Sequence, residues 1–262
     1  MKYLGKMVNN DARSLRGYEE KVFSQNGEDG ITVELVNRLY NNTNNQYYVE
    51  FGVQEFPLGT RGFPVGGDQC NTRILREKGW SGLLMDGWHE NENINLRKEF
   101  VTKENITSLF KKYGVPKKFE LLSVDVDFND FYILHRIIKE YLVDIIIVEY
   151  NAHFLPHEDA VVKHEANGGW DGYSNYFGAS LLAFKRMLNK YNYSLVYTEN
   201  QGVDAFFVNN DILGKNIQKF VNVDDIDALY SGAKYGHGPR GGHMTDTKNR
   251  KFIKSDDAIN DF

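Results

Sequence analysis

The feature that most constrains the fold of this chain is a regular alternation of short apolar segments with segments of helical periodicity. Residues 143–148 form the plainest strand, because nearly all of them are apolar and β-branched, as in strands buried on both faces of a sheet. Repeated strand–helix units predict a parallel sheet with helices on both faces, and right-handed crossovers restrict it to doubly wound arrangements. The expected strands are residues 47–53, 82–85, 119–124, 143–148, 194–197 and 203–208, and the expected helices are residues 30–40, 72–78, 91–100, 106–113, 131–141 and 179–192.

The last two expected strands break the parallel pattern. The residues between them, 199–202, read Glu-Asn-Gln-Gly and are too few for a helical crossover, so the two strands are expected to pair antiparallel. A parallel sheet finished by an antiparallel hairpin differs from an ordinary dinucleotide-binding fold. The predicted fold class is therefore α/β, with a mostly parallel sheet, helices on both faces and an antiparallel terminal strand.

The length of 262 residues fits one large α/β domain with small appendages. We expect an N-terminal extension over residues 1–22, the main domain over 23–210, and a C-terminal appendage or tail over 211–262. The last part, from about Lys248, has little apolar content and is expected to be either a surface strap or poorly ordered. Hydrophobic residues make up 41% and charged residues 26%, which is typical of globular rather than disordered proteins.

Charge and cysteine content narrow the partners and the compartment. The formal net charge of -5 argues against a general nucleic-acid binder, because neutralising phosphates requires a basic face. Cys70 is the only cysteine and cannot form a disulfide framework, so a reducing, cytoplasmic location is expected. The N-terminus lacks the apolar core of a secretory signal, and no apolar run approaches the roughly 20 residues that span a bilayer, so no membrane partner is expected. Association into a homo-oligomer stays open.

The first expected strand leads into a loop rich in glycine. In open α/β sheets, ligands bind beyond the carboxyl ends of the strands, and a glycine at position 52 lets the backbone approach a ligand closely. The loop that follows spells neither G-x-G-x-x-G nor a phosphate-binding P-loop. It is either a cofactor-binding loop or an insertion with turn glycines. Its glycines are Gly59, Gly62, Gly66 and Gly67.

The second expected strand ends at Asp86. An acid in this position can accept hydrogen bonds from the ribose hydroxyls of a nucleoside, which occur in both nicotinamide cofactors and S-adenosylmethionine (SAM). The next four residues, 87–90, read Gly-Trp-His-Glu and lie where they could flank the adenine. Their alternative interpretation is a helix entry with an acidic first turn.

Acidic side chains gather at the ends of the two central strands. Asp125 and Asp127 are two residues apart, so in an extended chain they point to the same side. The neighbouring strand leads into Glu149, Asn151 and His153. This set suits a hard divalent cation such as Mg²⁺ or Mn²⁺, with Asp125, Asp127, Glu149 and Asn151 as its ligands. It also suits an acid–base site without metal. The remaining alternative is that these acids only cap loops and pair with arginines.

Residues 168–177 combine glycines with four aromatic residues just before a predicted helix. Aromatic faces next to amides and carboxylates suit sugars and other small polar ligands. We expect Trp170 and Tyr173 to line a pocket. Tyr176 and Phe177 are at least as well explained by packing against the start of the helix.

Several of these segments together resemble the FkbM-type methyltransferases, over roughly residues 23–208. The family implies a Rossmann-like fold, SAM as cofactor, and methyl transfer to oxygen, often on sugar or polyketide hydroxyls. The likeness rests on residues 24–30 (Ser-Gln-Asn-Gly-Glu-Asp-Gly), 49–52 (Val-Glu-Phe-Gly), 71–72 (Asn-Thr), 79–82 (Gly-Trp-Ser-Gly) and 122–127 (Leu-Ser-Val-Asp-Val-Asp).

The resemblance also implies roles for individual residues. Glu50 and Gly52 fall on the first SAM motif, Asp86 on the ribose-binding acid, and Asp125 on the acid at the end of the active-site strand. The remaining cofactor-binding residues that it implies are Asn71 and Thr72, which follow the glycine-rich loop, and Ser24, Gln25 and Gly27, which would form an N-terminal lip over the cofactor.

The sequence departs from the family pattern in three places. Asp86 is followed by Gly87 instead of the usual proline. Residues 125–128 read Asp-Val-Asp-Phe where the family often has Asp-x-Glu-Gly, and the first motif lacks its second close glycine. These departures predict a divergent branch and bear on the acceptor more than on the cofactor.

The expected function is SAM-dependent methyl transfer to a hydroxyl of a small polar acceptor, a sugar or glycan. A free hydroxyl is a poor nucleophile, so it requires a base or a metal, and Asp125, Asp127 and His153 are the expected catalytic residues. One alternative is a nicotinamide-dependent oxidoreductase, although its tight pyrophosphate-binding turn is missing. Another is a non-catalytic binding module on a methyltransferase fold, which the clustered acids disfavour because unpaired buried acids are costly unless used.

Overall fold

The computed structural model describes residues 11–41, 46–53 and 70–260. These residues form a seven-stranded sheet in the order β3-β2-β1-β4-β5-β7-β6. All neighbouring strands pair parallel except β7, which runs antiparallel to both β5 and β6. The strands are β1 (Tyr47–Phe51), β2 (Ser81–Asp86), β3 (Leu96–Lys98), β4 (Lys118–Val124), β5 (Leu142–Glu149), β6 (Tyr193–Thr198) and β7 (Asp204–Asn209).

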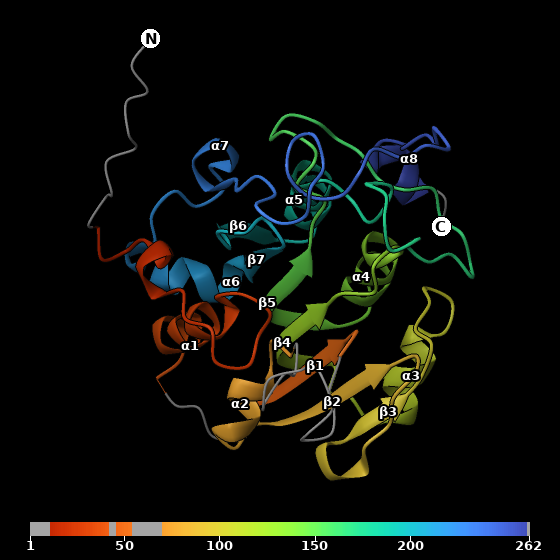
Figure 1. Cartoon of the computed structure of the whole chain (residues 1–262). Coiled ribbons are helices and arrows are strands. Elements are labelled where there is room, and N and C mark those ends of the chain that lie inside the picture. Colours follow the sequence, from red (N-terminus) through yellow and green to blue (C-terminus); the bar gives the residue numbers. More distant parts are fainter. Residues whose placement is uncertain (1–10, 42–45, 54–69, 261–262) are drawn as a thin grey trace.

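Helices cover both faces of this sheet, as Figure 1 shows with α1 on one side of the strands and α3 and α4 on the other. The α/β fold class predicted from the sequence, with its antiparallel last strand, is therefore confirmed. The α-helices are α1 (Glu28–Leu39), α2 (Arg73–Glu77), α3 (Ile106–Lys112), α4 (Asp130–Ile138), α5 (Leu181–Lys190), α6 (Asn210–Leu213), α7 (Ile226–Leu229) and α8 (Ser255–Asn260), and the 3-10 helices are η1 (Leu15–Tyr18), η2 (Glu92–Ile94) and η3 (Gly214–Lys219).

Two hydrophobic cores lie on opposite faces of the sheet because successive strand residues point to opposite sides. In β2, Leu83 and Met85 belong to the core beneath α3, α4 and α5, whereas Leu84 belongs to the core beneath α1. The central strand β5 contributes Ile146 to the first core and Ile145 to the second. Burial on both faces explains why this strand is a continuous apolar run rather than an alternating one.

The helix predicted over residues 91–100 is wrong. This segment forms the short turn η2 and then the edge strand β3, which pairs parallel with β2. Asn95 separates the two with a left-handed backbone, φ 55°, a conformation that ends a helix and that asparagine tolerates better than most residues. Its side-chain amide donates to the carbonyl of Gly82 at 2.7 Å, which fixes the turn against β2.

The C-terminal residues cross the surface as a strap instead of lying free. Ile253 exchanges two backbone hydrogen bonds with Val161, at 2.8 and 2.9 Å. Ser255 is buried at the start of α8, where its hydroxyl donates to Asp159 at 2.9 Å. Between the sequence's two alternatives for the segment after Lys248, the structure therefore shows the strap. Among the described residues, no helix has the length and apolarity needed to cross a bilayer.

The winding of the sheet places a crevice at one edge. From β1 the chain proceeds outward to β2 and β3, then returns to β4 on the other side of β1 and proceeds to β5. The carboxyl ends of β1 and β4 therefore flank the topological switch point, where doubly wound sheets bind their ligands. The side chains that follow these two strands determine what the crevice can hold.

Candidate active site

A cavity of about 320 Å³ opens at this switch point, above the ends of β1, β4 and β5. It gathers residues from segments far apart in the sequence, including the N-terminal part of the chain and a loop near residue 240. Five of the described lining residues are acidic, and none of them is a lysine or an arginine. The lining consists of Gln25, Asn26, Glu50, Phe51, Gly52, Asn71, Asp125, Asp127, Glu149, Trp170, Val203, Asp204, Tyr235 and His243.

Glu50 anchors the segment that leads into α2. The side chain is 3% exposed, and its two carboxylate oxygens accept from the amides of Asn71 at 2.7 Å and Thr72 at 3.0 Å. The hydroxyl of Thr72 and the thiol of Cys70 also donate to it, at 2.5 and 3.0 Å. Burial raises the pKa of Glu50, while these donors favour its charged form. Thr72 and Cys70 are thus buried partners of Glu50 behind the cavity wall.

Asn71 connects the floor of the cavity across three strands. Its side-chain amide donates to Ser123 in β4 at 3.2 Å and to Asp204 in β7 at 3.0 Å. Its backbone is held by Glu50 in β1. The residue therefore fixes the relative positions of β1, β4 and β7 where they meet the ligand space.

Gly52 lies at the close approach of two strand ends. Its φ is +75°, and a Cβ built on it would lie 1.7 Å from the carbonyl oxygen of Asp125. The sequence interpretation assigned this glycine to contact with a ligand. The structure shows that the space a side chain would take is filled by the backbone at the end of β4, so the glycine is required by packing.

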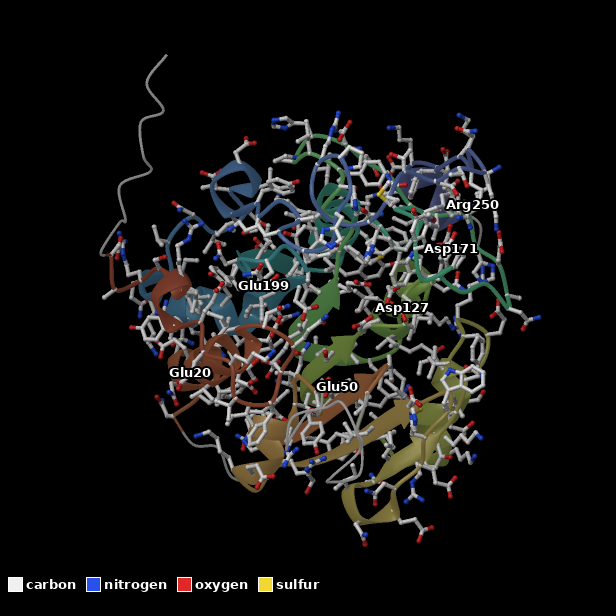
Figure 2. All side chains as sticks on the ribbon, viewed as in Figure 1. Glu20, Glu50, Asp127, Asp171, Glu199 and Arg250 are labelled. Atoms are coloured by element: carbon white, nitrogen blue, oxygen red, sulfur yellow. The ribbon has the colours of Figure 1, made fainter. Side chains whose placement is uncertain are left out.

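Asp125, Asp127 and Glu149 form a compact acidic cluster on one wall. One carboxylate oxygen from each lies within 4.8 Å of the others. Burial, and then the charge of Asp127, raises the pKa of Asp125 well above its usual value, and burial and the charge of Asp125 do the same for the pKa of Glu149. Asp127 holds its position with a left-handed backbone, φ 64°. Figure 2 shows it beyond the end of β4.

Asp86 ends β2 beside this cavity but is not part of its described lining. One carboxylate oxygen accepts from the backbone amides of Trp88 at 2.8 Å and His89 at 2.7 Å, and lies 2.8 Å from Nδ1 of His89. These contacts shape the 87–90 loop, in which Trp88 is 79% exposed. The other oxygen has no hydrogen bond to a described residue, which leaves it available to a ligand.

Of the N-terminal residues expected to form a lip over the cofactor, one lines the cavity and two stabilise the conformation of the segment. Gln25 lines the cavity. Ser24 is buried, and its hydroxyl donates to Asp29 at 2.7 Å, inside the first turn of α1. Gly27 precedes α1, and a Cβ there would lie 2.8 Å from Cβ of Glu19. Ser24 and Gly27 therefore hold the lip in shape. The glycine-rich loop with Gly59, Gly62, Gly66 and Gly67 lies outside the described residues.

Asn151 and His153 are not brought into the cavity. The amide nitrogen of Asn151 donates to the carbonyls of Asn175 and Phe177, both at 2.9 Å, and its oxygen lies 2.9 Å from Nδ1 of His153. Nε2 of His153 accepts from the backbone amide of His243 at 2.7 Å. Because both side chains are saturated by these contacts, neither is free to hold a metal or a substrate.

Six lining residues were not predicted as active-site residues: Asn26, Phe51, Val203, Asp204, Tyr235 and His243. His243 lies among aromatic rings, with its centroid 4.4 Å from that of Trp170 and 5.2 Å from that of Tyr235. Residues 236–243 read Gly-His-Gly-Pro-Arg-Gly-Gly-His. The density of glycine in this stretch is the signal of a tight loop that sequence reasoning passed over.

The loop that carries His243 is fixed to the aromatic segment 168–177. The amide of Asn175 donates to the carbonyl of Met244 at 2.8 Å, and the amide of Met244 to that of Tyr173 at 3.3 Å. Arg250 adds an ion pair with Asp171 at 2.7 Å, and Figure 2 labels both residues in the same part of the molecule. Trp170 lines the cavity as expected for a pocket wall, whereas Tyr173 is 61% exposed and is not part of the lining.

No protein-family model and no curated protein sequence matches the chain. Among solved structures, the chain is similar to the MycE methyltransferase from the mycinamycin biosynthetic pathway, solved in complex with Mg, SAH and mycinamycin VI, at 13% identity and a TM-score of 0.40 over 68% of this chain and 49% of that one. It is also similar to the CMeT domain of the citrinin polyketide synthase, at 11% identity and a TM-score of 0.34 over 69% of this chain and 50% of that one. The chain thus spans about half the length of each.

Proposed function

We propose that this chain is a SAM-dependent methyltransferase that methylates a hydroxyl of a small polar acceptor, a sugar or glycan. One observation carries the proposal: Gln25, Glu50, Asn71 and Asp125 line a single cavity at the switch point of a methyltransferase-type sheet. The FkbM-type family, which the sequence resembles, implies SAM contacts for these positions. Asp86 ends the adjacent strand, one step further along the sheet.

The charge of the cavity favours SAM over a nicotinamide dinucleotide. The carboxylates among its lining residues attract the sulfonium and ammonium groups of SAM and repel a pyrophosphate. We place SAM with its ribose hydroxyls at the oxygen of Asp86 that has no hydrogen bond to a described residue, and with its methionine end near Glu50 and Asn71. The nicotinamide alternative would bring two phosphate charges into the same acidic space.

The acceptor occupies the part of the cavity under Trp170. The indole nitrogen of Trp170 donates to the carbonyl of Ser174 at 2.6 Å, which fixes the ring as a flat wall. An aromatic wall opposite carboxylates suits the apolar face and the hydroxyls of a sugar ring. Transfer is an in-line displacement, so these residues act by aligning the acceptor oxygen with the methyl carbon and the sulfur.

The acidic cluster fits a hard divalent cation with oxygen ligands. Asp125, Asp127 and Glu149 each offer a carboxylate oxygen within 4.8 Å of the others. Ligands of one cation can be this far apart, because two ligands on opposite sides of Ca²⁺ are separated by about twice its ligand distance of 2.3–2.6 Å. None of the three has a hydrogen bond to its side chain from a described residue. A cation bound there would lower the pKa of an acceptor hydroxyl. The chain would supply the three carboxylates as ligands. Asn151 would not be a fourth ligand, because its side chain is already engaged in hydrogen bonds.

Calorimetric titration with S-adenosylhomocysteine (SAH) tests the cofactor, and NADH fluorescence tests the alternative. We expect saturable SAH binding and no NADH binding. A protein that binds NADH but not SAH would be the oxidoreductase, and a protein that binds neither would contradict both enzymatic hypotheses. Incubation with SAM carrying a labelled methyl group and a panel of methyl glycosides then tests the acceptor class.

Asp86→Ala is expected to weaken SAH binding by roughly 10–100-fold, because the ribose loses a charged acceptor worth about 1.5–3 kcal/mol. Asp86→Asn serves as the matched variant. Its oxygen can keep the caps on Trp88 and His89 while an amide replaces the free oxygen. A loss in both variants assigns the effect to the ribose contact. A loss in Asp86→Ala alone assigns it to the 87–90 loop, and unchanged affinity in both contradicts the placement of the cofactor.

Glu149→Gln is expected to reduce the affinity for Mn²⁺ by roughly 10–100-fold, because one charged ligand of three is lost. Calorimetric titration with Mn²⁺ alone measures the effect. Asp256→Asn, an exposed acid on the distant helix α8, is the control for loss of one negative charge. The cluster is not a cation site if the wild-type chain does not bind Mn²⁺, or if Glu149→Gln binds Mn²⁺ with the same affinity as Asp256→Asn.

A further inference from the structure

We infer that His243 is the base that takes the proton from the acceptor hydroxyl, and that His153 is a positioning residue that holds His243 at the cavity. The inference rests on the proposed methyltransferase function and names the residue that would complete it. It replaces the expectation from sequence that His153 is one of the catalytic residues. Both ring nitrogens of His153 are engaged in hydrogen bonds, whereas no described residue has a hydrogen bond to the ring of His243.

The imidazole of His153 is fully committed. The amide nitrogen of Asn151 donates to two carbonyls, so the oxygen of that side chain is the acceptor facing Nδ1 of His153 at 2.9 Å. Nδ1 therefore carries the proton, and the unprotonated Nε2 accepts from the backbone amide of His243 at 2.7 Å. The carbonyl of His243, 3.1 Å from Nε2, has no proton to accept in this neutral form. His153 cannot serve a substrate without releasing the loop.

Gly242 shows that the loop is built around this contact. Its φ is +67°, and a Cβ on it would lie 2.4 Å from Nε2 of His153. Only glycine permits the backbone to come close enough for the next amide to reach that nitrogen. The imidazole of His153 and the backbone at residues 242 and 243 therefore form one fitted unit, although 90 residues separate the two histidines.

The imidazole of His243 is free by contrast. It lines the cavity, and neither ring nitrogen has a hydrogen bond from a described residue. Its ring is held by Trp170 at 4.4 Å and Phe177 at 5.5 Å between centroids. Burial lowers the pKa of His243, and the charge of Asp171 opposes this effect only in part. The other ionisable groups that face it are His153 and Tyr235, whose rings contact it, and the acids that line the same cavity, which are Glu50, Asp125, Asp127, Glu149 and Asp204.

These features suit a proton acceptor on the acceptor side of the cavity. The hydroxyl oxygen forms a bond to the methyl carbon of SAM as the carbon–sulfur bond breaks, and the electron pair of that bond stays on sulfur, giving SAH. The hydroxyl proton passes to a ring nitrogen of His243 and then to water. The carboxylates of Asp125 and Glu149 remain available for a cation. A cation that lowers the pKa of the hydroxyl and a base that takes its proton would therefore use different residues.

The test compares His243→Gln with His237→Gln, an exposed histidine of the same loop. Labelled methyl transfer from SAM to methyl glycosides of glucose, galactose, mannose and rhamnose is measured, with SAH affinity by calorimetry in parallel. For His243→Gln we expect turnover to fall by about 10²–10⁴-fold, the usual contribution of a general base, with SAH affinity within about twofold of wild type. Added imidazole is expected to restore part of the turnover of His243→Ala. The His237→Gln control is expected to match wild type.

A second measurement separates the two histidines without relying on turnover. Nitrogen NMR of the imidazoles is expected to show His153 locked as the Nδ1-protonated tautomer and His243 titrating reversibly. Unchanged turnover in His243→Gln, or a His153 that titrates freely while His243 does not, overturns the inference. A wild-type chain that binds SAH but methylates nothing in the panel overturns it together with the acceptor class. Failure to bind SAH at all is the separate failure of the proposed function.

Discussion

Gly52→Ala is expected to lower the free energy of unfolding by more than about 4 kcal/mol, a loss at the extreme end of single substitutions. A Cβ at this position would lie 1.7 Å from the carbonyl oxygen of Asp125, which is backbone and cannot rotate away. The end of β1 would have to separate from the end of β4, where the acidic cluster begins. Urea unfolding followed by circular dichroism measures the loss. We expect the variant to lose SAH binding as well.

Gly79→Ala is the matched control, because it has the same left-handed backbone without the close contact. Gly79 has a φ of +87° and no atom within 4 Å of a built Cβ. Its substitution should cost only the backbone strain, about 1–2 kcal/mol. The difference between the two variants isolates the contact between β1 and β4. If Gly52→Ala costs no more than Gly79→Ala, that contact does not constrain the fold.

The central part of the fold could be predicted because it is encoded locally. The apolar run of β5 and the short link between β6 and β7 each require one kind of structure, and the structure has a buried central strand and an antiparallel pair at these places. The acids at the ends of β4 and β5 could be placed together for the same reason. Parallel neighbouring strands end at the same edge of a sheet, so Asp125 and Glu149 had to approach each other.

The segment 91–100 could not be assigned correctly from its own residues. Its pattern is compatible with a helix, but β2 has an open edge there that only a further strand can pair. Leu96 and Lys98 fill that edge, and Asn95 turns the chain to reach it. The deciding interaction is a tertiary pairing with β2, which local periodicity does not contain.

The contribution of Tyr235 and His243 to the cavity could not be predicted from the sequence, for a related reason. His153 follows a strand end and therefore looked like an active-site residue, whereas His243 lies in a stretch that resembled an appendage. In the folded chain, the amide of His243 donates to Nε2 of His153, which is 90 residues away in the sequence. This bond occupies His153 and holds His243 at the cavity, so each histidine has the role that the sequence suggested for the other. No spacing rule connects two loops that are joined only in the folded chain.

Glu50→Gln is expected to lower the free energy of unfolding by about 2–4 kcal/mol, and Glu50→Ala by more, because buried donors left without acceptors cost about 1–3 kcal/mol each. Four groups donate to this carboxylate, from Asn71, from Thr72 twice and from Cys70. A glutamine can offer only one oxygen, and its amide would face donors. The segment 70–72 would then lose its attachment to β1, and Asn71 its place on the cavity floor. We therefore expect SAH affinity to fall by more than about tenfold, which is about 1.4 kcal/mol.

Glu120→Gln distinguishes this anchoring from the general cost of removing an acid from the sheet. Glu120 lies in β4, the strand next to β1, and is only half-buried. Its carboxylate accepts from the single amide of Tyr47 at 2.7 Å, a bond that the oxygen of glutamine can keep. Glu120→Gln should lower the free energy of unfolding by less than about 1 kcal/mol, as expected for the substitution of a partly exposed polar residue. Equal losses at the two positions would mean that Glu50 is an ordinary strand acid. A loss confined to Glu50 would mean that a single buried carboxylate determines where the segment after the glycine-rich loop rejoins the sheet, and with it the shape of the proposed cofactor site.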